Sequence, residues 1–294
     1  MTQPRILIIG AGPAGLSAAL QLKRQGRQPV LMEGGQPGGL LHNAHWVENY
    51  PGFPEGISGP ALVERFLMQV DRFGVEITSA RVRNLGFEAG RFGVDTDQGR
   101  YAAEIVIVAS GTKARQYKDL PIPEGASAQI FYEVVPLLNK RGKTILIIGA
   151  GDAALDYALN LADGNQVVIL NRSRRVKGLR LLWERVQREP SIRYYDQHMV
   201  LSIQQGPDQR LEVDTFSNGE GHTFVCDYII PAIGRVPALD FLDESLENQA
   251  DSLSERGKLY FIGDVKNEAL RQTAIAVGDG LRAAMDIEHR LFGG

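Results

Sequence analysis

The sequence predicts an α/β protein with two parallel-sheet domains, the second inserted into the first. Three observations support this prediction. A glycine-rich turn occurs twice, each time after an apolar run and before a helical pattern. A hairpin pattern comes after each of these units, and a late segment returns the chain to the first one. With 294 residues, 44% of them hydrophobic, the chain can bury a core in both domains.

The first glycine-rich turn carries Gly10, Gly12 and Gly15. Residues 5–9 before it have the pattern of a buried strand, residues 16–25 that of a helix, and residues 29–32 form a second strand that delivers Glu33. Glu33 lies 33 − 10 = 23 positions after Gly10, close to the ~20 at which an acid reaches a ribose hydroxyl. Glycines also let the backbone approach a pyrophosphate at the positive end of a helix. The unit therefore predicts a dinucleotide site.

The second turn carries Gly149 and Gly151 and repeats this plan, with strands expected at 144–148 and 166–170 and a helix at 153–162. After the second strand the chain has Asn171, Arg172 and Ser173 in place of an acid. A guanidinium suits a 2′-phosphate, which a carboxylate would repel. NADP is therefore favoured over NAD. Two alternatives stay open: the basic residues after this point form a solvated face, or the site holds another adenine dinucleotide.

Repeated hairpins define the domain plan. Alternating residues at 93–99 and 212–219 predict antiparallel strands, and each leads into an apolar strand that ends in Gly111 or Gly234. Each domain is therefore predicted as a Rossmann-like sheet with an inserted meander, a three-layer ββα arrangement. Glycine and proline accumulate near both crossing points. The predicted domains are 1–114 with 235–294, and 115–234.

Charge and composition exclude several classes of protein. A net charge of −3 gives no reason to expect nucleic acid or an anionic membrane as a partner. No apolar run approaches the ~20 residues that span a bilayer, and no signal-peptide pattern opens the chain. The single cysteine, Cys226, fits a reducing compartment. We therefore expect a cytoplasmic protein, and the sequence shows no metal-ligand motif.

Further motifs bring a family resemblance. Residues 47–54 read Val-Glu-Asn-Tyr-Pro-Gly-Phe-Pro, and a Gly-Asp pair and an Arg-Gln pair occur late in the chain. With the two turns, these motifs resemble the low-molecular-weight thioredoxin reductases over nearly the whole chain. The resemblance implies a homodimer, FAD in the first domain and NADP(H) in the second. The implied FAD residues are Gly10, Gly12, Ala14, Gly15, Glu33, Gly39, Asn49, Ser110, Gly111, Gly263, Asp264, Arg271, Gln272 and Thr273. The implied NADP residues are Gly149, Gly151, Asp152, Ala153, Asn171 and Arg172.

The departures from that family concern its redox centre. Thioredoxin reductases carry a Cys-x-x-Cys and an acid before an aromatic pair that resembles Phe131-Tyr132, and here those positions hold Glu124, Ser127 and Ala128. Cys226 is expected at the start of a strand as a small buried apolar residue. Leu40 and Ser110 near the flavin, and Asn171 and Ser173 at the second site, also differ from the family pattern. Disulfide reduction by the usual internal route is therefore excluded.

The middle third also resembles ferredoxin–NADP reductases of thioredoxin-reductase fold, which lack the cysteine pair too. The chain ends soon after a helix expected near Gly280, without the C-terminal extension of those reductases. We therefore predict an FAD-dependent NAD(P)H oxidoreductase that passes electrons to ferredoxin or flavodoxin, docked on the basic cluster at 172–188. No side-chain acid or base is required, because the cofactors carry the chemistry. The alternatives are an FAD-binding redox sensor with a degenerate NADP site, and an oxidase that reduces oxygen or quinone.

Overall fold

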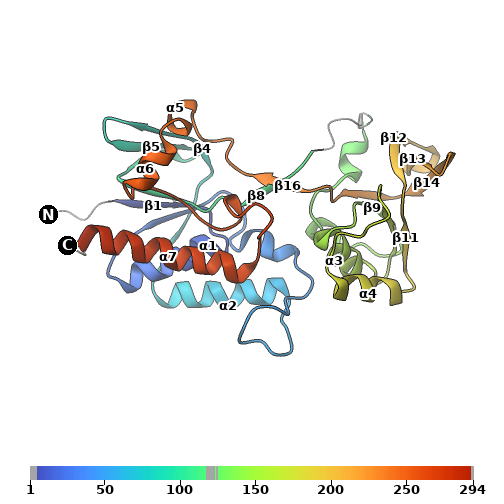
Figure 1. The fold of residues 1–294 in the computed structure, drawn as a ribbon, viewed down its shortest axis with the longest axis horizontal. Coiled ribbons are helices and arrows are strands. Elements are labelled where there is room, and N and C mark those ends of the chain that lie inside the picture. The colour runs from blue at the N-terminus through green and yellow to red at the C-terminus, as the bar shows by residue number, and fades with distance from the viewer. Residues whose placement is uncertain (1–4, 117–122, 124, 293–294) are drawn as a thin grey trace. The chain divides into compact units, whose positions relative to one another are not determined.

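The structure is a computed structural model that describes residues 5–116, 123 and 125–292. The chain forms two compact units (Figure 1). Unit 1 comprises Met1–His42, Val47–Lys113 and Val236–Gly294, and unit 2 comprises Asn43–Trp46 and Ala114–Arg235. The predicted breaks after residues 114 and 234 lie one residue from these limits. The assignment of Asn43–Trp46 to unit 2 was not predicted.

Unit 1 is built on a five-stranded parallel sheet of order β17-β7-β1-β2-β3. Its strands are β1 (Ile6–Ile9), β2 (Val30–Glu33), β3 (Ile77–Ser79), β7 (Ile105–Val108) and β17 (Leu259–Phe261). Its helices are α1 (Pro13–Arg24), α2 (Gly59–Arg72), α5 (Glu244–Glu247), α6 (Ala250–Glu255) and α7 (Thr273–Phe292), with the short 3₁₀ turns η1 (Gly39–Asn43) and η5 (Gly263–Val265). The antiparallel meander consists of β4 (Val82–Glu88), β5 (Arg91–Thr96) and β6 (Gly99–Ala103).

Alternation along β1 produces the layers of unit 1. Ile6 and Ile8 pack into one buried cluster with residues of α1 and α7. Leu7 and Ile9 point to the other side of the sheet, into a cluster with meander residues such as Phe92. Successive side chains of a strand face opposite sides, so an all-apolar strand supplies two cores. Helices α1, α2 and α7 therefore cover one face of the sheet, and the meander together with α5 and α6 covers the other (Figure 1).

Unit 2 repeats this arrangement with a four-stranded parallel sheet of order β11-β10-β9-β15. Its strands are β9 (Thr144–Ile148), β10 (Gln166–Leu170), β11 (Ile192–Tyr195) and β15 (Tyr228–Pro231), and its meander is β12 (Met199–Gln205), β13 (Leu211–Ser217) and β14 (Glu220–Cys226). Its helices are α3 (Asp152–Leu161) and α4 (Arg180–Arg188), with the 3₁₀ turns η2 (Ala126–Gln129), η3 (Val135–Leu137) and η4 (Pro207–Gln209). A two-stranded sheet of β8 (Thr112–Ala114) and β16 (Arg235–Pro237) contains the two points where the chain enters and leaves the long segment of unit 2.

Both predicted hairpins form, and one turn shows why. Asn218 and Gly219 join β13 to β14 with φ of 51° and 90°. Two successive residues with positive φ are the signature of a type I′ turn, whose twist matches that of the flanking strands. The three-layer ββα prediction is confirmed in both units.

Two predictions about single elements are wrong. The last helix begins at Thr273, seven residues before the expected start at Gly280. Gly280 lies inside α7 and does not break the helix. A Cβ at this position would collide with Ala14 O of α1, so the glycine allows the two helices to pack closely. Cys226 is the last residue of β14 and not the first residue of a strand. The two strands run together in the sequence because only Asp227 separates β14 from β15. Its predicted burial is confirmed, with 0% exposure.

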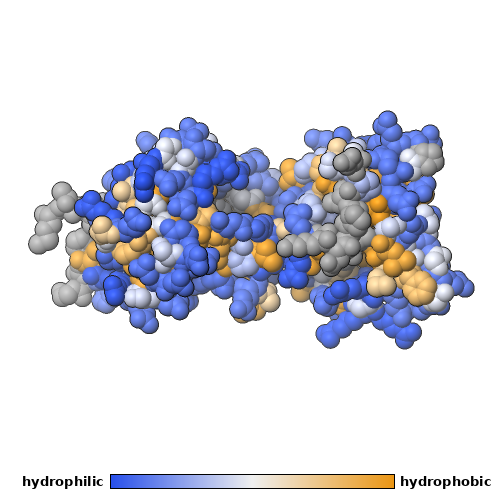
Figure 2. Space-filling model, turned by 90° about the horizontal axis from the view of Figure 1, so that it is seen from above, coloured by the Kyte–Doolittle hydropathy of each residue, from blue (hydrophilic) through white to orange (hydrophobic). Residues whose placement is uncertain are grey.

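The surface in Figure 2 is mostly hydrophilic, with apolar groups in small patches. Individual large apolar side chains are exposed, among them Leu270 and Met68. Within the described residues, none of the helices combines the length and the apolar character needed to cross a bilayer.

Candidate dinucleotide sites

The first glycine-rich turn lies between β1 and α1 and leaves open space where a pyrophosphate would bind. Gly10 has a φ of 104°, and a Cβ on it would collide with Ala109 O. A Cβ on Gly15 would collide with Gly10 O, whereas Gly12 has no heavy atom within 4 Å of its Cβ position. Gly12 caps α1 without a side-chain hydrogen bond, so the first amides of the helix stay available to an anion.

Glu33 ends β2 in an orientation fixed by two backbone amides. Ala11 N donates to Oε2 and Gly35 N donates to Oε1, each at 2.7 Å. A carboxylate has about four acceptor sites, so two remain for ribose hydroxyls. The predicted role of Glu33 is therefore geometrically possible, and the site fits the adenosine half of a dinucleotide.

Several other predicted FAD residues converge on this turn. The Cβ position of Gly39 lies 3.5 Å from Gly12 Cα, and that of Gly263 lies 2.8 Å from Ala14 Cβ. The Ser110 hydroxyl, just after β7, donates to Ala238 O at 2.7 Å. Gly111 next to it has open space at its Cβ position. The loops after four strands of one sheet, β1, β2, β7 and β17, thus meet at its carboxyl edge, where such folds bind their ligands.

The Arg-Gln motif directly precedes α7. The Asn49 amide donates to Gln272 Oε1 at 2.7 Å, which brings together two predicted flavin residues that are distant in sequence. The buried Nε of Arg271 has no hydrogen-bond partner among the described residues. An unsatisfied buried donor calls for an acceptor, and the carbonyl oxygens of a flavin ring are of that kind. Thr273 opens α7, and Asp264 lies in η5.

Sequence reasoning missed the role of Asp279. Its buried carboxylate accepts from Gly263 N at 3.1 Å and from the Asn267 amide at 2.7 Å. Lys266 Nζ lies 3.5 Å from its other oxygen. Asp279 therefore ties the Gly263–Val265 turn to α7. An acid between two glycines in a helical pattern is the signal that could have identified it.

The second turn, between β9 and α3, has the same local geometry. Gly149 has a φ of 123°, and a Cβ there would collide with Ala232 O. Gly151 has open space and caps α3 without a side-chain bond. Asp152 Oδ1 accepts from Leu179 N at 2.7 Å, while Ala153 is exposed in the first turn of the helix. The turn therefore also offers free helix amides to a pyrophosphate.

The segment after β10 forms a closed loop around Asn171. The buried Asn171 amide donates to Arg175 O at 3.1 Å and to the Tyr194 hydroxyl at 2.9 Å. Its oxygen accepts from Ser173 N at 3.3 Å. The side chain of Asn171 therefore holds the loop, while the Arg172 side chain is exposed. Of the two predicted readers, only Arg172 is accessible to a ligand.

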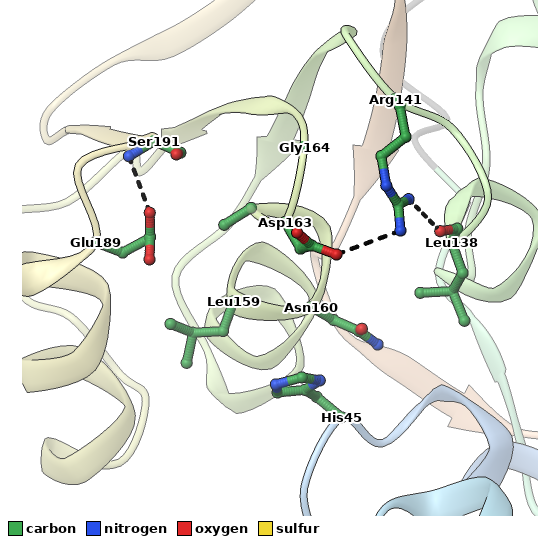
Figure 3. A pocket seen from close by; sticks show the side chains of 10 residues that line it. His45, Leu138, Arg141, Leu159, Asn160, Asp163, Gly164, Glu189 and Ser191 are labelled. Atoms are coloured by element: carbon green, nitrogen blue, oxygen red, sulfur yellow. Dashed lines mark hydrogen bonds and ion pairs between the residues drawn. The ribbon is translucent and has the colours of Figure 1, made fainter.

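A cavity of about 620 Å³ in unit 2 is separate from this site. Its lining includes Arg141 before β9, Asp163 before β10, and Glu189 and Ser191 before β11 (Figure 3). Arg141 donates to Leu138 O and to Asp163, and Glu189 accepts from Ser191 N at 3.1 Å. The cavity thus lies at the amino ends of the strands, and these polar groups already pair with one another.

Comparison with known proteins identifies similar proteins over nearly the whole chain. Residues 4–280 match the family model described as pyridine nucleotide-disulphide oxidoreductase. Thioredoxin reductase 2 of Arabidopsis thaliana is 30% identical, over 98% of this chain and 82% of that protein. Thioredoxin reductase of Rickettsia felis is also 30% identical, over 97% of both chains. Thioredoxin reductase of Lactococcus lactis, solved in its FR conformation, superposes with a TM-score of 0.88 at 26% identity, over 99% of this chain and 100% of that one.

Proposed function

The chain belongs to the pyridine nucleotide-disulphide oxidoreductase family, and we propose that it passes electrons from NADPH through FAD to an acceptor outside the chain. FAD and NADPH are its cofactors. Bound FAD would accept a hydride from one partner and pass the electrons to another. The protein contributes binding and orientation.

The observation that carries the proposal is the burial and low reactivity of the only cysteine in the sequence. Cys226 is fully buried. Burial and the neighbouring Asp227 carboxylate raise the pKa of its thiol to about 12. A thiol reacts as the thiolate, so this one is inert near neutral pH. The positions that match the family dithiol hold Ser127, in η2, and Glu124, which lies outside the described residues. These facts favour an external acceptor over an internal disulfide.

In the proposed reaction NADPH gives up two electrons as a hydride, two molecules of a one-electron carrier accept one electron each, and one proton is released to the solvent. Arg172 would hold the 2′-phosphate, and the turn at Gly149 and Gly151 the pyrophosphate. The turn at Gly10 and Gly12 would hold the flavin nucleotide. Because donor and first acceptor are both cofactors, their relative positions determine the rate, and no side-chain proton donor is required.

For the acceptor we propose an acidic one-electron carrier of the ferredoxin or flavodoxin kind. Its docking surface would be the basic surface, defined as Arg174, Arg175 and Lys177 in the loop before α4, with Arg180 and Arg188 on α4. All five side chains are exposed, although Arg180 also pairs with Glu184 at 2.7 Å. Opposite charge on a carrier would raise the rate of encounter and make it depend on salt.

Anaerobic rapid mixing tests the proposed electron path. The purified flavoprotein is mixed with NADPH and, separately, with NADH, and the flavin absorbance is followed. Bleaching within seconds, faster with NADPH, is the expected result. Absence of bleaching with either nucleotide would contradict the proposal and favour a redox sensor.

A second experiment identifies the acceptor. The reduced protein is mixed with ferredoxin, flavodoxin, quinone or air, and re-oxidation by a carrier at low salt is expected to be fastest. Arg188→Glu should slow it, while Arg91→Glu, which makes the same charge change on the meander of unit 1, should not. Rapid re-oxidation by oxygen or quinone alone would favour an oxidase.

A homodimer is also proposed. Leu281 and Met285 of α7 are 37% and 58% exposed and lie four residues apart, on one face of the helix. Exposed apolar residues in such a row are typical of a subunit interface. Sedimentation of Met285→Glu should show a monomer, whereas Met68→Glu, on α2, should sediment as the wild type does. An unchanged mass for Met285→Glu would exclude this face.

A further inference from the structure

The adenosine end of the first site has a further neighbour on the adjacent strand. Glu33 ends β2, and β3, the next strand and the edge of the sheet, runs parallel to it with Glu33 opposite Ser79. A ribose bound by Glu33 leaves its base beyond the carboxyl end of β2, on the side where the chain leaves the sheet. The residues directly after β3 are therefore the ones that a base can reach.

Arg81 is held at this place by contacts on two sides. Its guanidinium donates to Gly34 O at 2.8 Å, one residue after Glu33. A Cβ on Gly34 would lie 2.9 Å from Arg81 Cβ and 3.1 Å from its Cγ, so the stem of Arg81 rests on the glycine. Arg81 N donates to Asp97 Oδ1 at 2.8 Å, and Asp97 N donates to Arg81 O at 3.1 Å. The turn between β5 and β6 thus clamps Arg81 beside the end of β2.

The guanidinium is available to a ligand. The Arg81 side chain is exposed, and it makes no ion pair within the part of the chain that the structure describes. One of its five donors is used by Gly34. A planar, permanently charged guanidinium stacks on aromatic faces, and a desolvated contact of this kind contributes more than an exposed one. Adenine offers such a face.

We propose that Arg81, positioned by Asp97 and Gly34, contacts the adenine ring of bound FAD and sets the affinity for its adenylate half. The inference rests on FAD as the cofactor of unit 1 and not on any acceptor. It assigns a binding role to a residue outside both glycine-rich turns and outside the late motifs. It also gives the meander a function, because Asp97 belongs to the turn of that hairpin.

The experiment compares FAD with FMN, which lacks the adenylate. Holoprotein with FAD, and protein reconstituted with FMN, are diluted, and the fluorescence of released flavin gives the two dissociation constants. Arg81→Met should weaken FAD binding roughly 3- to 30-fold and leave FMN binding unchanged. Arg83→Met, an exposed arginine two residues away, is the matched control. Asp97→Ala should give part of the loss and add nothing to Arg81→Met.

Two results would overturn the proposal. One is equal weakening of FAD and FMN in Arg81→Met, which indicates a purely structural role. The other is a change no larger than that in Arg83→Met. Flavin release involves neither NADPH nor an acceptor, so this outcome is independent of the bleaching experiment.

Discussion

The two glycine-rich turns share one backbone plan but differ where the helix meets the strand. In both, the first glycine faces a carbonyl of the neighbouring strand end, Ala109 or Ala232, at a distance that excludes a side chain. The third position differs, with Gly15 in unit 1 and the buried Ala154 in unit 2. The first turn therefore has no room for the methyl group that the second accommodates. The start of α1 is in close contact with two segments. Gly15 lies against Gly10 O, and Gly280 of α7 lies against Ala14 O.

The turns also differ in the side chain at the end of the second strand, which is Glu33 in unit 1 and Asn171 in unit 2. In unit 1 a carboxylate is fixed by two amides and keeps acceptor sites for hydroxyls. In unit 2 the corresponding side chain, Asn171, is buried and holds a loop whose arginines face outward. One turn is thus arranged to accept hydrogen bonds from a ribose, and the other presents cations to an anion. The two units therefore share a fold and differ in the charge that they present at the end of the second strand.

The largest effect should come from exchanging the third position between the turns. Gly15→Ala places a methyl group on Gly10 O, so we expect about 1–3 kcal/mol lower stability of unit 1 and loss of bound FAD. Flavin content after gel filtration and the urea midpoint measure both. The reciprocal change, Ala154→Gly, should cost about 0.5–1 kcal/mol and leave the flavin in place. Full flavin content in Gly15→Ala would show that the turn has more room than the geometry indicates.

Removal of the carboxylate charge in unit 1 should have the next largest effect. Glu33→Gln should weaken FAD binding about 10- to 100-fold, because hydrogen bonds to a charged group contribute about 1.5–3 kcal/mol. The dissociation constant from flavin fluorescence checks this. Glu64→Gln, an exposed acid on α2, should bind FAD as the wild type does. If the two variants behave alike, Glu33 does not contact the ribose.

Removal of the cation in unit 2 sharpens the other half of the comparison. Arg172→Ala should raise the KM for NADPH roughly 10-fold and leave that for NADH nearly unchanged, because only NADPH carries the 2′-phosphate. Steady-state rates with an artificial acceptor supply both constants. Arg193→Ala, which removes an exposed arginine from β11, serves as the control. An equal rise for both nucleotides would refute the phosphate role of Arg172.

The smallest effect is expected at Cys226. With a thiol pKa of about 12, only about one molecule in 10⁴ is a thiolate at pH 8. Iodoacetamide should therefore label the protein only in urea. Cys226→Ala should keep the wild-type rate of electron transfer and lose about 1 kcal/mol of stability through the lost sulfur contacts. Labelling of the folded protein together with a lower rate in the variant would reopen a thiol mechanism.

Local patterns predicted the fold well because both sheets are built from short apolar strands with glycines at their ends. Residues 144–148 and 166–170 form the strands expected of them. The start of α7 was missed because Gly278 and Gly280 resemble a helix break, whereas Gly280 reflects contact with α1, near the other end of the chain. The binding loop of unit 2 was predicted by position only. The inward orientation of Asn171 depends on Tyr194, a partner on another strand that no local pattern reveals.

The contact between α1 and α7 has a consequence for the order in which the protein is made. β17, η5 and α7 come after unit 2 in the chain, yet Gly263 packs on Ala14 and Asp279 holds the turn beside it. A nascent chain can complete the inserted unit first, since domains fold as they emerge from the ribosome. The flavin pocket stays unfinished until Asp279 and Gly280 have been added. The first dinucleotide site therefore needs residues from both ends of the chain, on either side of the inserted unit.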